Sequence, residues 1–206
     1  MKLEDAQQYC SLMSEIKRRT VVIDGFASGI THAVYKATTI ESIYLQFRKI
    51  LELIALGSLA ANKDVFSKTY EKFSKYWNAE LLLKDIERVN PNFYPCPIIQ
   101  QTSSQLGIKM NWIDRSNDYL TREEMIKLYK KCGAIMHSGN PYGSRIDFRY
   151  YEQMIPQWRE KIVNLLNVHT ISLIDDQNLY LIQMGSMQEE ASYNVFSAHP
   201  DKSVAG

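Results

Sequence analysis

The stretch Thr38 to Ala61, TTIESIYLQFRKILELIALGSLAA, decides the fold. Its apolar residues recur with helical spacing along one face, and further leucines cover much of the opposite side. Thr38 with Glu41 fits a capping box, which predicts that the helix begins there. A helix that is apolar on nearly all sides is either packed on several sides or placed at a subunit interface.

Helical spacing also marks the sequence on both sides of this stretch. Tyr9, Leu12, Met13 and Ile16 predict a first helix that runs on towards Phe26. Further helices are expected at 64–77, at 78–89, at 121–137 behind a Thr121–Glu124 capping box, and at 156–166 with Pro156 in the first turn.

The C-terminal part changes from helical to strand patterning. Val168 to Ile174 and Leu179 to Met184 flank the turn residues 175–178 and predict a hairpin, to which Tyr193 to Ala198 can add a strand. The proline-rich segment 91–97 is expected to be an extended connector. The expected fold is mainly α: a helical bundle (1–166), a small antiparallel β-hairpin or three-stranded meander (167–200) and a flexible tail (201–206).

The composition is that of an ordinary globular chain. The 206 residues include 24 basic and 23 acidic side chains, which give a formal net charge of +1. This balance excludes the strongly basic surface of a dedicated duplex-DNA binder, although a local basic patch remains compatible with it. Thirteen Tyr and seven Phe are too many aromatic residues for a disordered chain.

The cysteines and the N-terminus indicate a cytoplasmic protein. Three cysteines without CxxC spacing favour reduced thiols over a disulfide framework. The N-terminal residues lack the apolar run of a signal peptide. The most apolar run, Ile50 to Ala61, is shorter than the roughly 20 residues that span a bilayer, so no membrane association is expected.

The segment around His137 carries the main functional signal. His137 is expected at the C-terminal end of a helix, where the helix dipole favours the imidazolium form and where a general acid or base is plausible. Lys131 precedes it and Arg145 follows it, and cations at such a place suit phosphodiester chemistry. The alternative interpretation is an ordinary helix end followed by a turn, with lysines on a solvated face.

Arg48 and Glu52 form a second candidate pair. They are four residues apart in the central helix and can form an ion pair on one face, which would be a structural role. The functional alternative is that Arg48 points into a cleft beside His137 and binds a phosphate in bidentate fashion.

Metal and cofactor sites find no support in the sequence. His32, His169 and His199 have no ligand-like spacing to one another or to cysteine. No phosphate-binding loop and no hydrolase motif is present, so no cofactor is expected. An aromatic cluster with interleaved lysines could stack RNA bases, but its helical spacing favours a core face: Tyr70, Phe73, Tyr76 and Trp77 with Lys68, Lys72 and Lys75.

The long central helix and the later helix ending at His137 together resemble the HEPN superfamily of small helical bundles. Lys131, five intervening residues and His137 match the spacing of that family's Arg–His motif, with Lys in place of Arg and Cys132 where Asn is common. The resemblance implies a metal-independent ribonuclease that works as a homodimer in phage-defence or toxin–antitoxin systems. His137 would be the general acid/base and Lys131 the transition-state cation, with Arg48, Arg145 or Asn140 binding phosphate.

A non-catalytic function is the alternative that remains open. Without the motif arginine, the same bundle could serve as a dimerisation or partner-binding module, for example for an antitoxin. The apolar surface of the central helix and an edge strand of the C-terminal hairpin would then be the contact surfaces.

Overall fold

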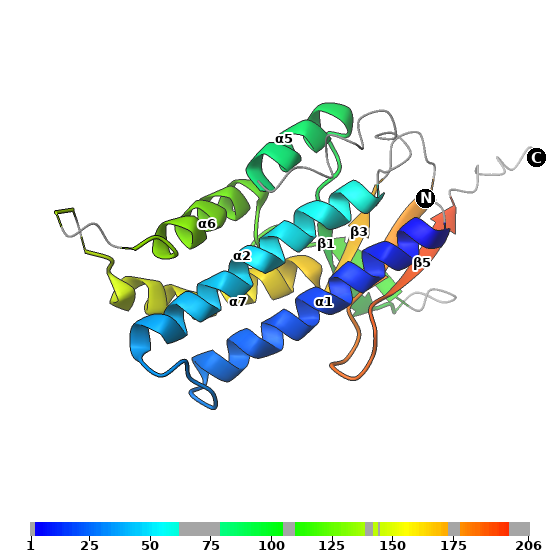
Figure 1. Ribbon diagram of the computed structural model, residues 1–206. Helices are drawn as coiled ribbons and strands as arrows, with labels where there is room; N and C mark the ends of the chain where they lie inside the picture. Colours follow the sequence, from blue (N-terminus) through cyan, green and yellow to red (C-terminus); the bar gives the residue numbers. More distant parts are fainter. Residues whose placement is uncertain are drawn as a thin grey trace, which may run out of the picture.

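The computed structural model describes residues 3–61, 79–104, 110–138, 142–143, 145–172 and 178–197. Within these ranges the helices are α1 (Leu3–Ala27), α2 (Lys36–Ala61), α5 (Ala79–Val89), α6 (Arg122–Ile135) and α7 (Phe148–Leu166). The strands are β1 (Cys96–Thr102), β2 (Met110–Asp114), β3 (Val168–Ile171), β4 (Asn178–Gln183) and β5 (Ser192–Ser197). Figure 1 shows the strands grouped at the end of the helical layer that holds the start of α1.

The helix α2 lies at the centre of the helical layer. It contacts α1, α5, α6 and α7, and its interior positions are almost completely buried. This packing confirms the interpretation of the apolar stretch as a helix surrounded on several sides. Leu45 and Leu56 are the large apolar side chains of α2 that stay exposed.

The start of α2 differs from the prediction. The helix begins at Lys36, upstream of the expected capping box, because a tight turn that includes left-handed Val34 leads directly into it. Thr38 is already helical, and its hydroxyl lies within hydrogen-bond distance of the carbonyls of Tyr35 and Ala33, to which its single O–H can donate, instead of accepting from a helix amide. Thr39 Oγ1 accepts from the backbone N–H of Ala33 at 2.9 Å.

Two other helix predictions are confirmed. Thr121 caps α6 and Glu124 completes the capping box, with hydrogen bonds in both directions between the two residues. The helix α5 ends at Val89, directly before Asn90, as expected from the Asn-Pro sequence. The helix expected at 64–77, with its aromatic and lysine residues, lies outside the described residues.

The start of α7 was predicted wrongly. Pro156 lies inside the helix, which begins at Phe148 with Asp147 as N-cap. An interior proline removes one helical hydrogen bond, here the one to the Glu152 carbonyl. The first turns of α7 are held against α2 at the neighbouring residue, because the Tyr44 ring packs edge-on against Tyr151 and the Tyr44 hydroxyl donates to the Tyr151 carbonyl at 3.0 Å.

The predicted fold class is wrong, because the chain contains a five-stranded antiparallel sheet in the order β2-β1-β3-β4-β5. The C-terminal strands β3, β4 and β5 pair as expected. The two additional strands come from residues before the expected bundle boundary, and β1 joins the sheet through Cys96 with Thr170 and Pro97 with His169. The molecule is therefore a helical layer packed on a sheet, and not a bundle with a small hairpin.

Helices and sheet share one hydrophobic core. A continuous cluster of buried side chains runs from the helices to Ile171, Tyr180 and Ile182 on one face of the sheet. On the other face Trp112 of β2 and Phe196 of β5 touch with their ring centroids 4.8 Å apart. These rings belong to the two edge strands, so the sheet is strongly curled around that second face.

Candidate functional site

The predicted site lies where α6 ends and α7 begins. The helix α6 ends at Ile135 with Met136 as C-cap, and His137 follows as an exposed residue, so the expected position of His137 just past a helix end is confirmed. Asn140, predicted as a phosphate ligand, lies outside the described residues. Arg145 is exposed in the segment that leads into α7.

Lys131 is anchored to the first turn of α7. Its ammonium group donates to the Tyr150 hydroxyl at 2.7 Å and lies 4.6 Å from the centre of the Tyr150 ring. A lysine ammonium has three N–H donors, so this bond leaves donors for a ligand. The Tyr150 contact therefore fixes the position of a positive charge that solvent can reach.

The Arg48 guanidinium is held by contacts within the helical layer. Its Nε lies 3.1 Å from Glu52 Oε1, its Nη2 donates to the Tyr129 hydroxyl at 2.8 Å, and its guanidinium lies 4.4 Å from the centre of the Tyr129 ring. The predicted ion pair with Glu52 is thus formed, at the α2–α6 contact. Among the described residues, His137 forms no hydrogen bond or ion pair with Arg48 or Lys131.

Exposed arginines add to the positive charge near Lys131. Arg145 and Arg149 are both exposed, and neither forms an ion pair with a described residue. The nearby carboxylate of Asp147 is engaged as the N-cap of α7, where it accepts from the Tyr150 amide at 3.1 Å. We refer to Lys131, His137, Arg145, Arg149 and Tyr150 as the α6–α7 end.

Cys132 next to Lys131 is not a nucleophile. The thiol is fully buried, and burial raises its pKa to about 12, against an opposing effect of the Arg48 charge. Because only the thiolate reacts, a cysteine in this state is inert at neutral pH. Its role in α6 is core packing.

The sequence analysis did not predict a buried hydrogen bond between Tyr9 and His169. Tyr9 Oη lies 2.8 Å from His169 Nε2, and His169 Nδ1 lies 2.9 Å from the Leu166 carbonyl. If Nδ1 donates to the carbonyl, Nε2 accepts from the tyrosine, and both ring nitrogens are satisfied. Burial lowers the His169 pKa to about 4, so the ring is neutral. No solvent reaches it, which excludes direct catalysis.

A buried lysine also escaped the sequence analysis. Lys17 of α1 is only 8% exposed, and its ammonium donates to the carbonyls of Met184, Ser186 at 2.8 Å and Glu189 at 2.6 Å. These carbonyls belong to the connection between β4 and β5. Lys17 therefore fixes this connection on the helical layer.

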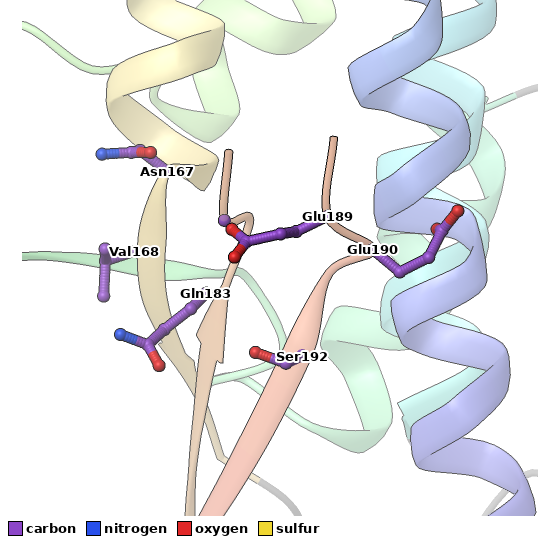
Figure 2. Close-up of a pocket in the computed structure, with 7 residues that line it drawn as sticks. Asn167, Val168, Gln183, Glu189, Glu190 and Ser192 are labelled. Atoms are coloured by element: carbon purple, nitrogen blue, oxygen red, sulfur yellow. The ribbon is translucent and has the colours of Figure 1, made fainter. Parts of the chain in front are cut away.

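The same connection borders an open cavity of about 520 Å³. Figure 2 shows Glu189 pointing into it towards the Gln183 side, while Glu190 points away towards α1. The Glu189 carboxylate accepts from the Ser186 amide, which lowers the pKa of Glu189. Since its polar groups are exposed acidic and amide side chains without a convergent centre, the cavity carries no assignable chemistry.

Two further features concern metal and membrane binding. Within the described ranges, no group of three or more His, Cys, Asp or Glu side chains could hold a metal ion. Of the helices in that part of the chain, none has the length and apolarity needed to cross a membrane.

Comparisons with protein-family models, curated proteins and solved structures gave no match. The resemblance to the HEPN superfamily therefore stays a prediction that rests on the α2 sequence and on the Lys131–His137 spacing.

Proposed function

We propose that the chain is a metal-independent ribonuclease that contacts RNA phosphates at the α6–α7 end. The Lys131–Tyr150 hydrogen bond is the observation that carries this proposal, since it holds an accessible ammonium group in a fixed position near a helix end. A cation fixed in advance stabilises the charge that develops on phosphoryl oxygens in the transition state. Exposed Arg145 and Arg149 would bind neighbouring phosphates.

His137 would act as the general acid/base in this proposal. Its exposed position allows it to reach a ribose hydroxyl or a leaving oxygen, and an imidazole carries one nitrogen that can accept a proton and one that can donate it. Arg48 has no part in it, because Glu52 and Tyr129 already hold its guanidinium.

We further propose a compartment, an oligomeric state and a partner for this activity. A cytoplasmic protein would meet RNA in a reducing compartment, in agreement with the free thiols of Cys10, Cys96 and Cys132. A homodimer, a phage-defence or toxin–antitoxin system, and control by an antitoxin-like partner protein are further parts of the proposal.

Cleavage of RNA in EDTA by the purified chain tests the catalytic step. We expect His137→Ala to slow cleavage by at least about 100-fold, as is typical for loss of a general acid or base. Lys131→Ala should give a comparable loss. Lys49→Ala is the matched control and should cleave normally, because Lys49 is an exposed lysine of α2 that pairs with Glu52. Equal cleavage by all four proteins, or none by the unchanged chain, contradicts the proposal.

RNA binding at increasing salt tests the phosphate contacts separately. Each phosphate contact with a single strand contributes about 0.7 to the slope of log affinity against log salt. We therefore expect the double variant Arg145→Ala/Arg149→Ala to bind more weakly and to lower that slope by about 1.4. An unchanged slope in filter binding would place the RNA elsewhere on the molecule.

A non-catalytic partner-binding function is the second candidate. It is favoured by the Arg48–Glu52 pair, because the arginine best suited to bidentate phosphate binding is already occupied by a carboxylate. Under this alternative the unchanged chain does not cleave RNA, and exposed edge-strand residues such as Val195 and Phe196 contact a partner protein.

A further inference from the structure

A small apolar pocket lies between α1, α7 and the connection from β4 to β5. Its volume is about 140 Å³. Its deep part is formed by almost completely buried side chains, namely Ile16, Ile162, Leu166 and Met184. An engineered apolar cavity of about 150 Å³ holds one benzene molecule, so this pocket has room for one ring or one branched aliphatic chain.

The β4–β5 connection forms one wall of the pocket, and its backbone is held in place by Lys17. The Lys17 ammonium binds three carbonyls of this connection and so has no donor left for a ligand. Gly185 has a φ of 67°, a backbone conformation that glycine adopts without strain. The buried end of the pocket is therefore rigid and offers no charge to a ligand.

The opening of the pocket carries an ion pair. Asp24 and Arg159 line the pocket and are partly exposed, and two parallel hydrogen bonds of 2.8 Å join the carboxylate to Nε and Nη2 of the guanidinium. Arg159 Nη1 takes part in neither bond, and each Asp24 oxygen can accept once more. The Arg159 guanidinium and the Asp24 carboxylate thus lie next to each other at the edge of the apolar pocket.

We propose that this pocket binds a free apolar α-amino acid of the size of leucine. The aliphatic side chain occupies the hollow, the α-carboxylate accepts from Arg159 Nη1, and the α-ammonium group donates to Asp24. A ligand with only one charge would satisfy one of the two groups and meet the like charge of the other. A zwitterion matches both, and the volume of the hollow selects its side chain. This site is separate from the α6–α7 end and does not depend on the proposed ribonuclease activity.

Titration calorimetry of the full chain with leucine and three analogues tests the ligand chemistry. 4-Methylpentanoate lacks the ammonium group, isoamylamine lacks the carboxylate, and alanine has a methyl group in place of the isobutyl side chain. We expect leucine to bind and each analogue to bind at least about tenfold more weakly, since one charge-assisted hydrogen bond contributes about that factor and burial of three further apolar carbons contributes at least as much. Equal binding of leucine and the two singly charged analogues would overturn the zwitterion assignment.

Tryptophan substitutions on α1 test the location. Val21 lines the opening, whereas its neighbour Val22 is similarly exposed but does not line the pocket. Val21→Trp should abolish leucine binding and Val22→Trp should preserve it, with both variants unchanged in thermal unfolding without ligand. Leucine binding that survives Val21→Trp, or no binding to the unchanged chain at about 10 mM leucine, which means a Kd weaker than the millimolar range, would overturn the proposal.

Discussion

Replacing Lys17 by Met is expected to lower the free energy of unfolding by about 3–4 kcal/mol. The ammonium group of Lys17 is the shared donor for the carbonyls of Met184, Ser186 and Glu189. Methionine fills nearly the same volume but donates nothing, so the carbonyls lose their partner. A buried carbonyl without a partner costs about 1–3 kcal/mol, and the two nearer the surface lose charge-assisted bonds that water replaces only in part.

The effect should be specific to the buried position. Lys49→Met removes an exposed lysine whose only described ion pair is with Glu52, and exposed pairs contribute about 0–1 kcal/mol. Urea unfolding followed by circular dichroism measures both variants against the unchanged chain. If Lys17→Met and Lys49→Met lower the free energy of unfolding equally, Lys17 does not hold the β4–β5 connection.

Most helices could be predicted because their signals are local. The spacing of apolar residues identified α2, and the Thr121–Glu124 pair marked the start of α6 within a few residues. The start of α7 was missed because Pro156 indicated a first turn there, although Asp147 is a local N-cap signal. The contact of its first turns with Tyr44 joins residues 107 positions apart in the sequence.

The strands β1 and β2 were not predicted, because Pro97 argues against a strand and the pairing with β3 is distant in the sequence. Pro97 lies within β1 and argues against a strand, because proline lacks the N–H that a sheet ladder needs. It is tolerated because Pro97 lies one residue before the β1–β2 ladder, which runs from Ile98 to Thr102, and faces that side with its carbonyl, which accepts from the Arg115 amide at 2.9 Å. The partner strand β3 begins 66 residues after β1 ends, so no local pattern indicates the pairing.

The candidate site was predicted in part. The position of His137 follows from the helix-end signal, and the Arg48–Glu52 pair follows from the four-residue spacing. Tyr150 as the partner of Lys131 was missed, since it lies across the α6–α7 contact. Lys17 was missed because a single lysine in an amphipathic helix normally reaches solvent, and its carbonyl partners follow more than 160 positions later.

His169 is expected to make the stability depend on pH below neutrality. In the folded chain its pKa is about 4, whereas an unperturbed histidine has a value of about 6.5. Between these two values the unfolded chain binds a proton that the folded chain excludes. Acidification therefore favours unfolding, and the contribution of neutral His169 is present above pH 6.5 and lost as the pH falls towards 4. The expected loss between pH 7.5 and pH 5 is about 2 kcal/mol.

A double variant separates this effect from the titration of carboxyl groups. Tyr9→Phe/His169→Leu removes both partners of the buried hydrogen bond and leaves neither polar group unpaired, although the Leu166 carbonyl loses its contact. Glu15, Glu123 and Glu189, whose pKa values are lowered in the folded state, titrate in both proteins and cancel in the comparison. The unchanged chain should lose about 2 kcal/mol more than the double variant between pH 7.5 and pH 5 in urea unfolding. Parallel pH profiles for the two proteins would mean that His169 is protonated in the folded state. In that case Nε2 could not accept from Tyr9, and the neutral pair inferred from the buried geometry would be wrong.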